Sequence, residues 1–513
     1  GGAMVNNALR VFRNRPEYRF KDRLHEQIAH TLPTYVPGRI EQSAVRVTHY
    51  GYLGAVRDAK EKSQRNVELL RRQAAESPQT PFLHFNLGSE YIVAGELFAA
   101  IEELKTARTL LAQDGSITRC EYAPSLFTRL VMVLRMCGRM AEAQTTAVEG
   151  LELFPQFTDL VLAQARIAQM QGETDQAIAL YHRCLAMGDA PAHYGPQLGG
   201  GTFLPRLALG ELHLARNEVA EARTELQRCV DHHPEFLAVA GPYALALLRD
   251  GVSGGEVSAR LESLDALPSS VRLTVAGVLH GAGATEEAEQ QYRLALQAAP
   301  TNARARTGLG ELLLARGAWD EAVDQAAAVP TEDPYAGLAA RIELCGLIGR
   351  APGERVQAAL TRATAAGLSS AEQAVFTTWA AIAEGTAVTE PLTVAGAPLL
   401  GVILETLLRG ADGERFVALL PVLHRSRLPR REQRELLAQM YLTHGLVAQA
   451  AQEWLAAASE APDVRSMLGL AQVALHQGMA EDAVNFATAA LELDPACAQA
   501  RALLSTIPAD AAA

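Results

Sequence analysis

The sequence has few aromatic residues, and this scarcity limits the fold classes that it can adopt. Phe, Trp and Tyr make up 5% of the 513 residues, whereas hydrophobic residues as a whole make up 49%. Alanine supplies much of this apolar content, which favours closely packed helices over a sheet of branched and aromatic side chains. At about 150 residues per domain, the length allows about three domains or one long repeat array.

Paired cysteines and long apolar runs are also missing. The six cysteines show no Cys-x-x-Cys spacing and no neighbouring spaced histidines, which argues against a disulfide framework and a zinc site. No apolar run reaches about 18 residues, and no charged-then-apolar leader is present. We therefore expect a soluble, cytoplasmic protein with free thiols and no membrane span. The cysteines are Cys120, Cys137, Cys184, Cys229, Cys345 and Cys497.

Positive charge is scarce outside the N-terminal part of the chain. The formal net charge is −12, yet residues 1–76 hold 14 Lys and Arg against 8 Asp and Glu. An acidic body argues against general binding to a nucleic-acid backbone, because such binding needs clustered cations. We expect no nucleic-acid partner, and a helical DNA-binding regulator is disfavoured.

Small, aromatic, glycine and proline residues recur with an internal period. Ala276 and Gly310 stand at matching places in neighbouring units, as do Ala438 and Ala471, and the period is about 34 residues. Eight units share the pattern, which resembles the tetratricopeptide repeat (TPR), a helical hairpin that stacks into a solenoid. The units are marked by Leu87, Leu130, Ala165, Leu209, Val275, Leu309, Leu437 and Leu470.

The residue types at fixed positions fit a helical hairpin on physical grounds. Small residues such as Gly210 and Ala222 are expected where the two helices cross, because a larger side chain would push them apart. Tyr292 and Trp454 are expected to fill the space between neighbouring hairpins. A glycine after the first helix permits the turn, and a proline ends the second helix.

The array is not uniform along the chain. Met187–Thr202 are extra residues between two repeat units. We expect them to form a protruding, flexible loop without a phosphate-binding role. Residues 331–430 match the repeat poorly and predict degenerate hairpins. Within them, Leu338–Ile348 and Leu399–Leu408 are predicted helices, and Gly385–Pro398 is a predicted break.

The N-terminal residues have a different character. Prolines interrupt short mixed segments, residues 44–52 alternate like a strand, and residues 56–70 follow an amphipathic helical period. Four runs in order resemble the end of the catalytic domain of a family 2 glycosyltransferase, of the kind fused to TPR arrays in bacteria. These runs are Leu9–Asn14, Arg23–Gln27, Thr48–Tyr52 and Lys62–Leu70.

The resemblance implies transfer of a sugar from a nucleotide-sugar donor, with a divalent metal (Mn or Mg) held by an Asp-x-Asp motif. It implies that His25 and Glu26 are catalytic, with Glu26 as the candidate base. It also implies substrate binding by the side chains Arg10, Arg13, Asn14 and His49. The donor half of such a domain lies upstream of the matching runs, so no metal ligand is assigned and we expect this chain by itself to be inactive.

Simpler interpretations of these residues stay open. A His-Glu pair in a loop is more often a surface hydrogen bond than a catalytic pair. Arg10 and Arg13 could be exposed strand charges, and His49 could pack against the first hairpin. In the first repeats, a carboxylate clamp of the TPR type is not expected, because no lysine stands at the matching positions. Those positions hold Phe85, Asn86, Ser89, Thr128, Arg129 and Met132.

The sequence therefore predicts a mainly α fold, a TPR helical solenoid preceded by a short α/β glycosyltransferase remnant. The predicted division is a remnant at 1–54, a connecting helix at 55–80, a TPR array at 81–330, degenerate repeats at 331–430, and TPR repeats with a capping helix at 431–513. The leading hypothesis is the C-terminal portion of a glycosyltransferase whose solenoid positions a protein or peptide acceptor. The alternative is a non-catalytic TPR scaffold for protein–protein interaction.

Overall fold

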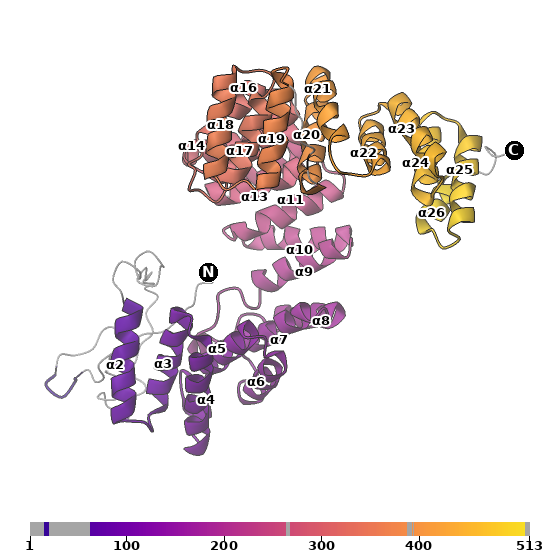
Figure 1. The fold of residues 1–513 in the computed structure, drawn as a ribbon. Coiled ribbons are helices and arrows are strands. Elements are labelled where there is room, and N and C mark those ends of the chain that lie inside the picture. The colour runs from indigo at the N-terminus through magenta and orange to yellow at the C-terminus, as the bar shows by residue number, and fades with distance from the viewer. Residues whose placement is uncertain (1–14, 20–61, 263–266, 387–391, 393, 508–513) are drawn as a thin grey trace. The chain divides into compact units, whose positions relative to one another are not determined.

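The computed structural model describes residues 15–19, 62–262, 267–386, 392 and 394–507. The chain forms two compact units, Gly1–Val252 with Arg260–Asp265, and Ser253–Ala259 with Ala266–Ala513. Helices joined by short connections dominate both units (Figure 1). An isolated β-bridge joins Leu392 and Ser426.

The first unit is a series of helical hairpins with three short 3-10 turns. Its elements are α2 (Lys62–Glu76), α3 (Pro81–Ala94), α4 (Leu97–Gln113), η4 (Ile117–Arg119), α5 (Ala123–Met136), α6 (Met140–Leu153), α7 (Thr158–Met170), α8 (Thr174–Met187), η5 (Ala192–Tyr194), α9 (Phe203–Ala215), α10 (Val219–His232), η6 (Leu237–Val239) and α11 (Ala240–Arg249). The helix α12 (Gly254–Glu262) spans the division between the two units.

The second unit continues the same architecture. Its elements are α13 (Ser269–Gly281), α14 (Thr285–Ala298), α15 (Ala303–Ala315), α16 (Trp319–Ala327), α17 (Ala336–Leu347), α18 (Gly353–Ala365), α19 (Ser370–Ala383), η7 (Val394–Gly396), α20 (Ala397–Arg409), α21 (Gly413–His424), α22 (Arg430–Thr443), α23 (Val447–Glu460), α24 (Val464–His476), α25 (Ala480–Leu493) and α26 (Ala498–Thr506).

The contacts at the repeat positions confirm the predicted hairpin geometry. A Cβ added to Gly210 would lie 2.4 Å from Cγ of Leu226, so glycine allows α9 and α10 to approach closely. The turn glycine Gly283 has a φ of +79°, and Asn217 takes the equivalent place between α9 and α10 with a φ of +60°. Asn is among the few residue types that tolerate this left-handed conformation.

Aromatic side chains fill the space between successive hairpins, as the sequence predicts. A Cβ on Gly308 of α15 would lie 2.6 Å from the ring of Tyr292 on α14. A Cβ on Gly469 of α24 would lie 2.2 Å from the indole of Trp454 on α23. Each ring therefore occupies the space that a glycine leaves on the first helix of the next hairpin.

Polar cross-links recur at one register of the hairpins. In five pairs a side chain near the start of the first helix contacts a residue 19 positions later on the second helix. Four of the pairs place Arg or His on the first helix and Glu or Gln on the second at 2.6–3.1 Å, and one such pair is longer at 3.4 Å. Glu343 and Arg362 are also 19 positions apart, but they lie later in α17 and α18 and outside this register. The first five pairs are His84–Glu103, Arg206–Glu225, Arg272–Gln291, Arg306–Gln325 and Arg434–Glu453.

The region of poor repeat match is held together by a buried arginine. Arg415 of α21 lies with its guanidinium 4.6 Å from the ring centre of Trp319 and 5.4 Å from that of Trp379. It donates hydrogen bonds to the backbone carbonyls of Cys345 and Gly346, which belong to an earlier hairpin. The α20–α21 hairpin thus packs onto α15, α17 and α19 as well as onto its sequence neighbours.

The predicted protruding loop at Met187–Thr202 is instead packed, so that prediction is wrong. The ring of Tyr194 lies 5.6 Å from Phe154 and 5.4 Å from Phe157, centre to centre. Gly199, Gly200 and Gly201 are buried. The aromatic contacts and the close glycine backbone hold the segment against α6 and α7.

Asp159 of α7 anchors the same segment. Its Oδ2 accepts a hydrogen bond from the backbone N–H of Gln197 at 2.6 Å. Its other oxygen is buried and has no hydrogen-bond partner among the described residues. Burial raises the pKa of Asp159 to about 6, with a further increase from Asp189 and an opposing effect of Arg166.

We expect Asp159→Asn to stabilise the first unit at neutral pH. A carboxyl whose pKa is raised on folding stabilises the fold below about pH 4, and this contribution is lost as the pH rises to about 6. The free energy of unfolding should therefore rise by about 1–3 kcal/mol at pH 7.5 and change little at pH 4. Urea unfolding followed by circular dichroism measures this effect. The exposed control Asp231→Asn should leave the free energy of unfolding unchanged at both pH values. An equal change for Asp159→Asn at pH 4 and at pH 7.5 would contradict the raised pKa of Asp159.

Candidate functional site

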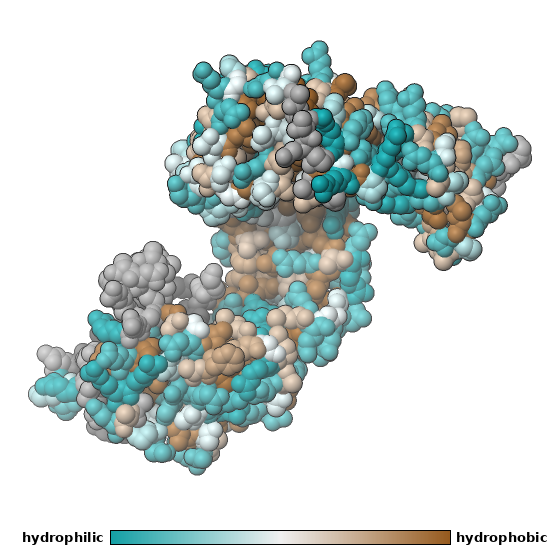
Figure 2. Space-filling view, viewed as in Figure 1, coloured by the Kyte–Doolittle hydropathy of each residue, from teal (hydrophilic) through white to brown (hydrophobic). Residues whose placement is uncertain are grey.

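A groove in the second unit is lined by the first helices of its last hairpins. Its volume is about 980 Å³, and it lies between α22, α24 and the closing helix α26. Figure 2 shows hydrophobic residues exposed among hydrophilic ones around α24–α26. The lining residues are Ala397, Pro398, Leu428, Glu432, Glu435, Leu436, Gln439, Trp454, Arg465, Leu468, Gly469, Gln472, Leu475, Gln499, Ala502, Leu503 and Thr506.

The apolar part of the groove is built from buried and half-buried side chains. Leu468 is buried, and Leu436, Leu475 and Leu503 are half-buried. Trp454 is 5% exposed and is held against Gly469, and its indole Nε1 has no hydrogen-bond partner in the described part of the chain. A preformed apolar surface of this kind gives a ligand side chain a place to bury without first reorganising the protein.

The polar part of the groove combines an ion-pair network with amides. Glu435 accepts from Arg431 at 3.1 Å and from Arg465 at 2.9 Å, so its charge is compensated. Three glutamines line the groove, namely Gln439 of α22, Gln472 of α24 and Gln499 of α26. Each amide both donates and accepts, which suits hydrogen bonding to the backbone of a peptide.

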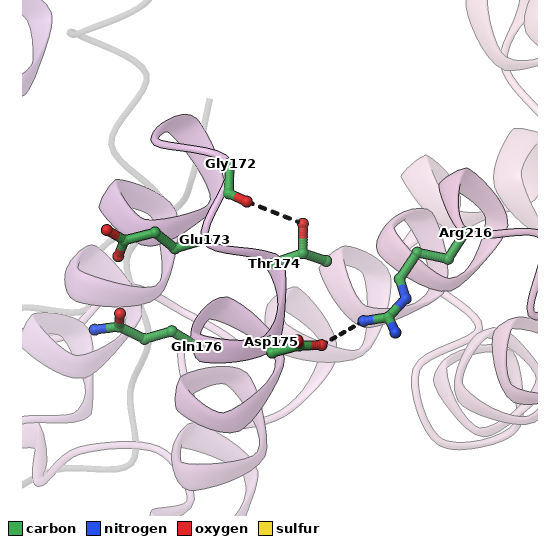
Figure 3. A pocket seen from close by; sticks show the side chains of 6 residues that line it. All are labelled: Gly172, Glu173, Thr174, Asp175, Gln176 and Arg216. Atoms are coloured by element: carbon green, nitrogen blue, oxygen red, sulfur yellow. Dashed lines mark hydrogen bonds and ion pairs between the residues drawn. The ribbon is translucent and has the colours of Figure 1, made fainter.

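A second depression, in the first unit, is shallower and offers less chemistry. It is lined by Gly172–Gln176 and Arg216 and has a volume of about 510 Å³ (Figure 3). Arg216 contacts Asp175 at 2.5 Å and Glu218 at 2.8 Å. Figure 3 shows Glu173 and Gln176 pointing away from this ion pair. The charged groups facing the depression thus satisfy one another.

The buried cysteines of the described ranges are poor nucleophiles. Cys184, Cys229 and Cys345 are buried, and burial raises the pKa of these thiols to about 12, about 11 and about 12. Such thiols stay protonated and unreactive. Within those same ranges, no group of three or more His, Cys, Asp or Glu side chains could hold a metal ion.

The residues predicted for sugar transfer lie outside the described residues. This applies to Arg10, Arg13, Asn14, His25, Glu26 and His49, and to the predicted strand at 44–52. Their assigned roles, and the α/β remnant to which they belong, therefore stay predictions. The predicted connecting helix is described from Lys62 as α2, with Val67 and Leu70 buried. No helix in the described ranges is both long and apolar enough to cross a membrane.

Comparisons with known proteins identify the repeats. Residues 279–342 and 435–500 each match the family described as "Tetratricopeptide repeat". The first segment runs from the end of α13 to the middle of α17, and the second runs from within α22 to the start of α26. The two matched segments therefore contain tetratricopeptide repeats, and the described helices as a whole form TPR-like hairpins.

Solved structures with similar helical repeats include a tetratricopeptide repeat protein from Parabacteroides merdae ATCC 43184. It has 15% identity and a TM-score of 0.33, with 60% of this chain and 99% of that chain covered. TTC0263, a thermophilic TPR protein in Thermus thermophilus, has 24% identity and a TM-score of 0.28, covering 38% of this chain and 96% of that chain. The Pseudomonas aeruginosa pilF structure has 20% identity and a TM-score of 0.30, covering 40% and 89%. No curated protein matches the sequence.

Proposed function

We propose that this chain is a protein-interaction scaffold and that the groove between α22, α24 and α26 binds a segment of a partner protein. The groove itself carries this proposal. It has buried and half-buried apolar side chains on one part and three amides on another, contributed by neighbouring repeats. An extended segment or a helix can bury apolar side chains in such a groove, while the amides bond its polar groups.

The experiment compares two double variants with the unmodified chain. Gln439→Arg/Gln472→Arg fills the groove with two long charged side chains at half-buried or exposed positions, so the fold should be retained. Gln449→Arg/Gln452→Arg makes the same substitution at exposed positions of α23 that do not line the groove. Partners captured from an extract of the source cells are identified for each, and circular dichroism checks that the helices remain intact.

We expect a set of partners that the unmodified chain and the α23 variant share and that the groove variant loses. A peptide from such a partner should then bind the purified chain in calorimetry, with at least about tenfold weaker binding to the groove variant. An identical set of partners for all three proteins would contradict the proposal.

A second candidate function is the sugar transfer that the four N-terminal runs suggest. Its support is the order and separation of those runs in the sequence, directly before the repeats. Under this proposal, Glu26 and His25 act at the sugar, and a nucleotide sugar and a divalent metal bind in a more extensive domain. Calorimetry of the more extensive form that includes the donor half, with nucleotide sugars and manganese, tests it. Absence of heat, together with an unchanged result for Glu26→Ala, would remove these residues from the site.

A further inference from the structure

Two arginines lie close together in the first unit without a carboxylate partner. Arg135 of α5 and Arg166 of α7 are both half-buried. Burial, and then the like charge of Arg166, lower the pKa of the Arg135 guanidinium. Its closest described polar contact is the sulfur of Met170, 3.6 Å from Nη1. Neither guanidinium forms an ion pair with any carboxylate in the described ranges.

The carboxylates nearest to this pair do not neutralise it. Asp159, on the same helix as Arg166, is used by Gln197 and has a raised pKa. Glu211 of α9 forms no ion pair in the described ranges, and burial raises its pKa. Both arginines act to lower the pKa of Tyr181, but its phenol donates a hydrogen bond to Oε1 of Gln169 at 2.7 Å. Arg166 acts to lower the pKa of Asp159 but forms no ion pair with it, so neither guanidinium has a carboxylate partner in the described ranges.

Exposed apolar side chains flank the arginine pair. Met136 is 57% exposed and Met170 is 56% exposed, and they occupy equivalent positions at the ends of α5 and α7, one repeat apart. Val93 holds the corresponding place on α3 and is 47% exposed. Flexible thioethers adapt to the shapes of different apolar partners. The surface thus offers two cations beside a row of adaptable apolar contacts.

We propose that the surface formed by Arg135, Arg166, Met136 and Met170 binds a partner protein segment that carries acidic side chains next to apolar ones. Charge complementarity identifies this occupant, because the pair is positive and uncompensated on a chain with a net charge of −12. A planar guanidinium forks onto a carboxylate, and two such groups side by side suit two acidic side chains. The methionines distinguish this partner from a phosphate chain, which would leave them uncovered.

The surface belongs to the first unit and shares no residue with the groove of α22, α24 and α26. A negative binding result for this surface is therefore distinguishable from a negative result for the groove of the proposed function. The probes are short synthetic peptides with two glutamates and two leucines at varied spacing. They are acetylated and amidated, so that only side-chain carboxylates are charged. The same peptides with glutamine in place of glutamate, and a single-stranded RNA of similar charge, serve as comparison probes.

Fluorescence anisotropy measures binding to the full chain, to Arg135→Gln/Arg166→Gln and to the control Arg119→Gln/Arg183→Gln. The control removes the same charge from exposed positions of the same unit. We expect acidic peptides to bind the unmodified chain and the control, with affinity falling as salt rises, and to bind the Arg135/Arg166 variant at least tenfold more weakly. Equal binding to both variants, no binding of any acidic peptide, or preferred binding of the RNA would overturn the proposal.

Discussion

Arg415→Met is expected to lower the free energy of unfolding of the second unit by about 3–5 kcal/mol. The substitution removes a buried cation that is stacked between two indoles and bonded to two backbone carbonyls. It also leaves those carbonyls and Asp412, which lies 3.5 Å from the guanidinium, without their partner. A methionine side chain fills part of the space but satisfies none of these groups.

Tryptophan fluorescence measures this effect directly. All three tryptophans of the chain, Trp319, Trp379 and Trp454, lie in the second unit, so urea unfolding followed by their emission reports on that unit alone. Arg425→Met, an exposed change next to the same helix, is the matched control. If both variants unfold at the same urea concentration, the buried arginine does not have the role assigned to it.

The second large effect is expected from Gly469→Ala in α24. Alanine normally stabilises a helix relative to glycine by about 1 kcal/mol. Here the new Cβ would lie 2.2–2.4 Å from two carbon atoms of the Trp454 indole, and that ring is too buried to move aside without cost. We expect a net loss of about 1–3 kcal/mol in the free energy of unfolding.

Gly277→Ala in α13 supplies the control for this prediction. It is the same substitution in a helix of the same unit, but nothing lies within 4 Å of the added Cβ. This variant should gain about 0.5–1 kcal/mol. Opposite signs for the two alanines, measured by tryptophan fluorescence in urea, would support the contact between hairpins, and equal gains would refute it.

The parts of the fold that the sequence predicted correctly depend on local spacing. The position of Gly210 against Leu226 and of Tyr292 against Gly308 follows from the repeat period, because each contact joins residues of the same or the next hairpin. The repeat residues therefore carry enough information to place most hairpins from their spacing alone.

The parts that the sequence did not predict depend on distant contacts. Nothing near Arg415 in the sequence indicates that it stacks on Trp319, which belongs to a much earlier hairpin. The Met187–Thr202 segment looks like a loop by composition, and only its contact with Phe154 and Phe157 holds it in place.

The C-terminal groove was also missed, although a signal for it was available. Gln439 and Gln472 stand one repeat apart on the first helices of two neighbouring hairpins. The repeat pattern assigns no role to these glutamines, because it is defined by small, aromatic, glycine and proline positions. Their common direction into one groove becomes evident only when the helices are packed together.

The polar cross-links have a consequence for how the hairpins find their correct partners. Similar helices in one chain can pair wrongly during folding, since their apolar surfaces are alike. A mispaired hairpin of α9 with α23 would bring Arg206 against Glu453, a contact of the same kind as the native Arg206–Glu225 and Arg434–Glu453 pairs. These cross-links therefore stabilise a hairpin without identifying its partner, and correct pairing depends on the short connection that keeps its two helices adjacent.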